Sequence, residues 1–175
     1  MIVYKGFEKG LVCRGYQFKP NAVNVCEKAK TAREGFHSAE NPLDVLTYYP
    51  NPETSVYWTC EVGGDVDEDG HDSKVSSTEL TPTHEIGIEG ILTWGYAMHI
   101  GREDFAESNK RKFGRPATAN RGYAISICED ARAKGSDGDL LLIIDDNDAA
   151  LLEVGEDGIK PNVWYNARGE EVAEG

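Results

Sequence analysis

The sequence has few cysteines and no apolar run that approaches the roughly 20 residues of a membrane-spanning helix. Its four cysteines are far apart, and none forms a Cys-x-x-Cys pair, so the sequence predicts neither a zinc site nor structural disulfides. The N-terminus has no basic segment followed by an apolar one, as a secretion signal would have. We therefore expect a cytoplasmic protein with reduced thiols and no membrane partner.

Positive charge is also scarce, because 18 Lys and Arg face 31 Asp and Glu and leave a formal net charge of −13. Such a surface repels phosphate backbones, so direct nucleic-acid binding is not expected. It suits the basic surface of another protein or of a nucleoprotein complex. From Glu129 onward, thirteen acids stand against four bases, and we take as candidate binding residues Asp139, Asp145, Asp146, Asp148, Glu153, Glu156 and Asp157.

The pattern of apolar and turn-forming residues predicts an α+β fold. Residues 54–62 are β-branched and aromatic, as in a strand, whereas 85–112 is the most helical stretch. We expect a mixed α/β domain over residues 1–112 and a small all-β, β-roll-like region over 113–175. Further elements are expected as strands at 2–7, 11–18 and 73–81 and as a helix at 42–49.

Small residues recur at a spacing of seven in the segment that follows residue 112. Residues 117, 124 and 131 are all Ala, and residues 119, 126 and 133 are Ala, Ser and Ala. This spacing suits short strands stacked around a narrow interior, and it resembles the head repeat of trimeric autotransporter adhesins. An alanine-rich strand pair that matches by chance is the alternative. A repeat with open strand edges also allows a homo-oligomer, and the tail from Ala167 is expected to be frayed.

Both ends of the chain carry distinctive short sequence patterns. The N-terminal patterns are YKGF at 4–7, CRGYQF at 13–18 and GFHSAENPLDVL at 35–46, and KPNVWY at 160–165 closes the chain. In these patterns the chain resembles an uncharacterised family of phage and prophage proteins. The resemblance implies phage–host biology in the cytoplasm of a bacterial host cell, and it names no reaction.

The order of elements in the first half is similar to the ADP-ribosyltransferase layout. That resemblance implies NAD as a cofactor, with Tyr4 facing the ligand and Tyr48 or Tyr49 stacking on the nicotinamide ring. Glu79 or Glu85 would stabilise an oxocarbenium-like transition state. The chain lacks the Ser-Thr-Ser and Glu/Gln-x-Glu motifs of that family, so a core role for the aromatic residues is the alternative.

Two further patterns bear on possible sites. Asp65, Asp67 and Asp69 match the start of an EF-hand calcium loop, but position twelve is Ser76 where a bidentate glutamate is needed. An acidic hairpin turn is therefore the preferred interpretation, and no metal site is predicted. His37 is the best candidate for a functional histidine, with a hydrogen-bonded structural role as its alternative.

These observations predict an acidic binding protein, encoded by a phage or prophage, that inhibits a bacterial defence complex. Anti-CRISPR proteins of this kind imitate nucleic acid with carboxylates and need no catalysis. The alternatives are an ADP-ribosyltransferase-like enzyme or nucleotide binder, and an oligomeric virion accessory protein.

Overall fold

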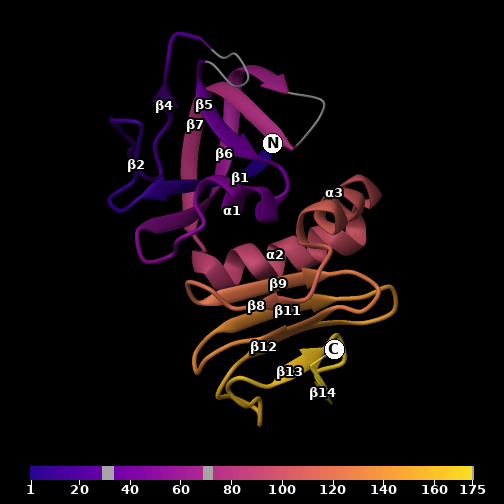
Figure 1. Cartoon of the computed structure of the whole chain (residues 1–175). Coiled ribbons are helices and arrows are strands. Elements are labelled where there is room, and N and C mark those ends of the chain that lie inside the picture. The colour runs from indigo at the N-terminus through magenta and orange to yellow at the C-terminus, as the bar shows by residue number, and fades with distance from the viewer. Residues whose placement is uncertain (29–33, 69–72, 175) are drawn as a thin grey trace. The chain divides into compact units, whose positions relative to one another are not determined.

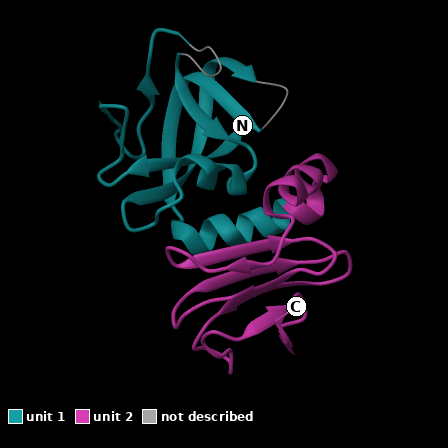
Figure 2. Ribbon diagram, in the orientation of Figure 1, with its two compact units in different colours: residues 1–98 teal, residues 99–175 magenta. Residues whose placement is uncertain are grey.

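The computed structural model describes residues 1–28, 34–68 and 73–174 (Figure 1). The chain forms two compact units, unit 1 over residues 1–98 and unit 2 over residues 99–175 (Figure 2). The boundary between the units falls inside helix α2 (Gly87–Gly101), earlier in the chain than the change after residue 112 expected from the sequence. Helices and strands are both present, which confirms the α+β class.

Unit 1 is built on four strands that close into a ring. Strand β1 (Ile2–Glu8) pairs with β5 (Phe36–Ala39) and with β6 (Ser55–Glu68). Strand β7 (Lys74–Glu85) also pairs with β5 and with β6, so the four strands form a small closed barrel. Successive residues of a strand point to opposite faces, so every second side chain faces the interior. The residues that face inward are mainly apolar. The core comprises Val3, Phe7, Leu11, Phe18, Phe36, Cys60, Val75 and Leu80.

Short elements surround this ring. The segment expected as one strand over 11–18 is two short strands, β2 (Val12–Cys13) and β3 (Tyr16–Gln17), which pair with each other. Arg14 and Gly15 between them both have positive φ, so the chain reverses there. A further short strand, β4 (Asn24–Val25), pairs with β7.

Helix α1 (Pro42–Tyr48) begins where the sequence predicts it. The Asn41 side chain accepts a hydrogen bond from the Leu43 N–H, and Pro42 occupies the first helical turn. The helix buries Leu43, and a Cβ added at Gly95 of α2 would overlap the Leu43 side chain. This glycine therefore permits close packing of α2 on α1 within unit 1.

Unit 2 winds back and forth between two sheets after helix α3 (Glu103–Phe113). Its strands are β8 (Ala117–Thr118), β9 (Tyr123–Ile127), β10 (Arg132–Lys134), β11 (Leu140–Ile144), β12 (Ala149–Glu153), β13 (Trp164–Asn166) and β14 (Glu171–Val172). Strand β8 pairs in parallel with β10, and β9 pairs in parallel with β11. Ala124, Ala131 and Ala133 are buried in its core. Small side chains thus fill a narrow interior, as expected for a β-roll-like region.

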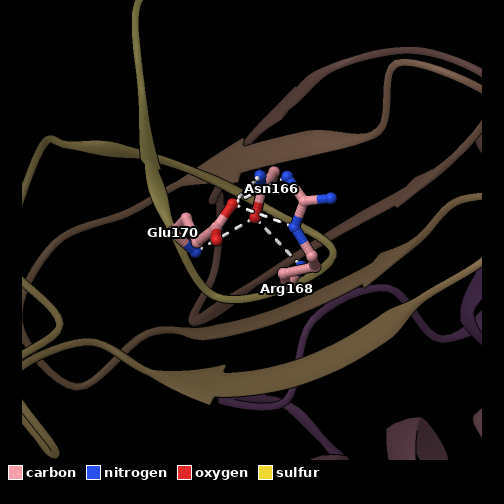
Figure 3. A network of polar contacts seen from close by, with 3 residues as sticks. All are labelled: Asn166, Arg168 and Glu170. Atoms are coloured by element: carbon pink, nitrogen blue, oxygen red, sulfur yellow. Dashed lines mark hydrogen bonds and ion pairs between the residues drawn. The ribbon is translucent and has the colours of Figure 1, made fainter.

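Residues 167–172 are held in the fold of unit 2, which differs from the expectation of fraying from Ala167. Ala167 is buried, and β13 pairs with β14 beyond it. The turn between them is held by the Asn166 side chain, which accepts from the N–H groups of Arg168 and Glu170 (Figure 3). Arg168 also forms an ion pair with Glu170 at 2.8 Å. Among the residues that the structure describes, no helix is long and apolar enough to cross a membrane.

Candidate functional site

Unit 1 contains a cavity of about 350 Å³ between β1, the β2–β3 turn, β5, α1 and the start of β7. Its lining comprises Tyr4, Lys5, Gly6, Cys13, Arg14, His37, Ser38, Ala39, Asp44, Val45, Tyr48, Tyr49 and Lys74. The volume lies at the lower end of the range of small-molecule sites in proteins.

The cavity forms where β1 and β5 separate. The two strands share one pair in register, Tyr4 with Ala39, whereas β1 and β6 stay paired over seven residues. Tyr49, just after α1, packs its ring on Gly6, where an added Cβ would overlap the ring. Glycine in the YKGF pattern is therefore required for this wall of the cavity.

Lys5 is the most unusual residue of the cavity because it is a lysine that is only 4% exposed. Its Nζ donates to the carbonyl oxygen of His37 at 2.5 Å and to Sγ of Cys13 at 3.7 Å. The same atom lies 5.2 Å from the ring centroid of Phe7 and 5.7 Å from that of Phe18. Burial lowers the pKa of the Lys5 amine, since a charged group loses hydration there.

The cavity is basic although unit 1 as a whole is acidic. Unit 1 has eight Lys and Arg and fifteen Asp and Glu, yet the cavity lining holds Lys5, Arg14 and Lys74 and a single acid, Asp44. The pKa of His37 is lowered first by burial and then by these same three cations. The local field therefore favours negative charge, and His37 is neutral at pH 7.

Two polar groups of the lining have no hydrogen-bond partner among the residues that the structure describes. They are Oγ of Ser38, whose residue is 7% exposed, and Nε2 of His37. Asp44, in contrast, accepts from Nδ2 of Asn41 at 3.1 Å and from Oγ of Ser73 at 2.7 Å. Buried polar groups are normally satisfied, so Oγ of Ser38 and Nε2 of His37 each have hydrogen-bonding capacity that the described residues leave unused.

Aromatic rings form the remaining walls. Tyr4 is buried, and its ring centroid lies 6.5 Å from that of Trp94. Tyr48 is 56% exposed, and Nζ of Lys74 lies 4.8 Å from its ring centroid. Burial and a hydrogen bond with Cys13 raise the pKa of Tyr49, whose hydroxyl lies 3.1 Å from Sγ of Cys13. The Tyr49 phenol is therefore protonated at neutral pH.

The structure brings together four of the six residues named from the sequence as catalytic candidates. The cavity lining includes Tyr4, His37, Tyr48 and Tyr49, but it does not include Glu79 or Glu85. Glu79 pairs with Gly63 across β6 and β7, and its side chain lies over Gly63. Glu85 is exposed at the end of β7. The carboxylate that the ADP-ribosyltransferase layout implies is thus not supplied at this site by either glutamate.

Several acidic candidates of unit 2 have structural roles. Oδ2 of Asp139 accepts from the Ser136 N–H at 2.7 Å. Oδ1 of Asp145 accepts from the N–H groups of Asn147 and Asp148 in the β11–β12 turn.

Other acidic candidates of unit 2 interact with nearby cations. Asp146 forms an ion pair of 2.6 Å with Lys110, and the negative charges of Asp145 and Asp148 contribute to the raised pKa of Arg168. The remaining three, Glu153, Glu156 and Asp157, are exposed.

Two of the three candidate calcium ligands lie within the described residues. Asp65 and Asp67 lie in the exposed part of β6, and Asp69 lies outside the described residues. In residues 1–28, 34–68 and 73–174, no three His, Cys, Asp or Glu side chains are grouped closely enough to hold a metal ion.

Sequence reasoning missed the cations of the cavity. Lys5 and Gly6 belong to the YKGF pattern, and Cys13 and Arg14 belong to CRGYQF. Because these residues lie within the two patterns, the patterns could have indicated them as candidate site residues. Lys74 has no such signal, since only the pairing of β5 with β7, which sets Ala39 opposite Lys74, brings it to the cavity.

The part of the chain that holds this cavity matches a known protein family. No curated protein matches the sequence, and no solved structure matches it. One family model, described as a domain of unknown function (DUF7666), matches residues 1–93, which include every residue of the cavity lining. Because this match covers more than half of the chain, the protein belongs to the DUF7666 family.

Proposed function

We propose that unit 1 binds a small anionic molecule with a planar ring, of the mononucleotide class, in the cavity between β1, β5 and α1. The observation that carries this proposal is the gathering of Lys5, Arg14 and Lys74 at one cavity of an otherwise acidic unit. Arg and Lys side chains are the usual partners of phosphate and carboxylate groups.

The walls of the cavity support the proposal that the ligand has a planar ring. Tyr4, Tyr48 and Tyr49 offer aromatic surface for a planar ring. Ser38 and His37 offer polar atoms without other partners, which suits the edge of a base or a sugar hydroxyl. A volume of about 350 Å³ favours a mononucleotide over a dinucleotide such as NAD.

Calorimetric titration with AMP and with adenosine tests this function. We expect AMP to bind more tightly than adenosine, because only AMP carries the phosphate. Arg14→Gln and Lys74→Gln should each weaken AMP binding by about tenfold, the effect of losing one charge-assisted contact of roughly 1.4 kcal/mol. Neither change should alter adenosine binding by a comparable factor.

The matched control is Lys9→Gln, which removes a positive charge from an exposed residue outside the cavity lining. AMP affinity should stay the same in this variant. Equal AMP affinity in the unaltered protein and in the Arg14→Gln/Lys74→Gln double variant would contradict the proposal.

A second candidate function is inhibition of a host defence complex in the bacterial cytoplasm through the acidic surface. Glu153, Glu156 and Asp157 support it, since they are exposed on a rigid strand end and turn and belong to no hydrogen bond or ion pair of their side chains among the described residues. Capture of a nucleic-acid-handling complex from host lysate by tagged protein tests this candidate. Binding should be lost at high salt and in the triple variant Glu153→Gln/Glu156→Gln/Asp157→Asn, and persistence in both cases would contradict it.

A further inference from the structure

Lys5 has an environment that the binding of an anion alone does not explain. It is 4% exposed and lines the cavity, and no carboxylate pairs with it among the residues that the structure describes. A buried ammonium without a counter-ion is costly, whereas a buried neutral amine is much less so. A binding lysine needs its charge, but a nucleophilic lysine needs its lone pair.

We propose that Lys5 is a nucleophile that forms an imine with the carbonyl group of a ligand held in this cavity. The ligand class is a small aldehyde or ketone that also carries a phosphate or carboxylate group. This inference rests on the proposed anion-binding function and deepens it by naming the reactive group of the ligand.

The groups that face the Lys5 amine shift its pKa in both directions, and burial outweighs the rest. Burial is the largest influence on its pKa and lowers it, and Arg14 lowers it further. Cys13 of β2 and Cys60 of β6 act in the opposite direction through their sulfur atoms. Burial raises the pKa of the Cys60 thiol to about 12, so Cys60 carries no charge near pH 7 that could hold Lys5 protonated.

The reaction is balanced without an oxidant or a metal. The Nζ lone pair attacks the carbonyl carbon, a C–N bond forms, and the carbonyl electron pair moves to oxygen. One proton passes from nitrogen to that oxygen, which gives a carbinolamine. The C–O bond then breaks as the oxygen takes a second proton from nitrogen, so that water leaves and a C=N bond remains.

A proton donor lies close to the amine. The Tyr49 hydroxyl contacts Sγ of Cys13 at 3.1 Å, and Sγ of Cys13 lies 3.7 Å from Nζ of Lys5. The phenol is protonated at neutral pH, so it can donate a hydrogen bond to the departing hydroxyl group. Arg14 and Lys74 line the same cavity and place positive charge near the anionic group of the ligand.

Pyridoxal 5′-phosphate is a suitable probe because it combines a planar ring, a phosphate and an aldehyde. The full chain is incubated with it near pH 7, reduced with cyanoborohydride, digested and mapped by mass spectrometry. We expect labelling of Lys5 to exceed that of exposed Lys9 by at least about tenfold. An ordinary lysine, with a pKa near 10.4, has only about one amine in 2,500 neutral at that pH.

Pyridoxine 5′-phosphate separates this inference from the proposed function, because it has an alcohol in place of the aldehyde. Its binding, measured by calorimetry, tests the cavity alone, and it should protect Lys5 from labelling. Binding of the alcohol with no label on Lys5 would overturn the imine while leaving the binding function standing. Label on Lys5 that the alcohol does not prevent would also overturn the imine within this cavity. Failure of both the alcohol and AMP to bind would overturn the function itself.

Two variants complete the test. Lys5→Met removes the amine and should abolish the label at position 5. Lys9→Arg, at an exposed turn, should leave the Lys5 label unchanged. If Lys5→Met does not fold, the peptide map of the unaltered chain decides the question by itself.

Discussion

His37 links ligand binding to pH at the scale of a single residue. Its pKa is lowered by burial and by Lys5, Arg14 and Lys74, and a bound anion would offset those cations. The pKa of His37 is then higher in the complex than in the free protein, so binding takes up protons. Affinity should therefore rise as the pH falls through and below the ordinary histidine value of 6.5, and it should level off once both states are protonated.

The dissociation constant of AMP, measured from about pH 8 to about pH 5.5, checks this prediction. AMP itself takes up a proton near pH 6, so the informative quantity is the difference between the unaltered protein and His37→Asn. We expect this difference to grow about threefold or more as the pH falls. His84→Asn is the control, since His84 is exposed in β7 outside the lining. Parallel pH profiles for all three proteins would show that the cavity field does not act on a bound anion.

The residues of the cavity show which parts of the site could be predicted from the sequence. Sequence reasoning selected Tyr4 and Tyr49 from the ADP-ribosyltransferase layout and His37 as the best candidate for a functional histidine, and the structure places all three at one cavity. It passed over Lys5 because a lysine in a short strand is normally solvated at the surface. The burial of Lys5 follows from the closure of four strands far apart in the chain, a property that no local pattern contains.

At the scale of the element, we predict that unit 2 needs small residues in its core in order to be stable. Ala133 of β10 is 0% exposed and lies in the core with Leu141 and Tyr165. Ala133→Leu should lower the free energy of unfolding by about 1–3 kcal/mol, because the interior has no room for a larger side chain. Ala173→Leu, the same change at an exposed position, should alter stability by less than about 0.5 kcal/mol.

Hydrogen exchange at the backbone amides of β11 measures this change within unit 2. Exchange should accelerate in Ala133→Leu and stay unaltered in Ala173→Leu. Equal protection in the two variants would mean that the seven-residue spacing of small residues does not reflect a narrow interior.

Elements with a strong local signal were predicted well, and those set by turns or pairing were not. The seven-residue spacing predicted the β-roll-like region because every turn of such a coil repeats the same steric demand. The segment 11–18 was predicted as one strand, since the positive φ of Arg14 is not visible in its residue type. The tail was predicted as frayed, because the polar residues Asn166, Arg168 and Glu170 suggest a loop until their mutual bonds are known.

At the scale of the whole molecule, charge acts in two directions on an anionic ligand. The chain carries −13 overall, whereas Arg14 and Lys74 place positive charge at the cavity beside the basic residue Lys5. The screening length is about 30 Å at 0.01 M salt and about 8 Å at 0.15 M. At the lowest salt an approaching anion therefore interacts with the whole acidic chain, but near 0.15 M it interacts mainly with the cavity.

AMP affinity should consequently pass through a maximum with ionic strength instead of falling steadily. Repulsion by distant carboxylates is screened first, and attraction by Arg14 and Lys74 is lost only near 1 M, where the screening length is about 3 Å. Titrations at about 0.01, 0.15 and 1 M salt check this order, with adenosine as the uncharged control. A steady fall from the lowest salt would mean that the cavity cations outweigh the net charge at every distance, and a steady rise would mean that they contribute nothing to binding.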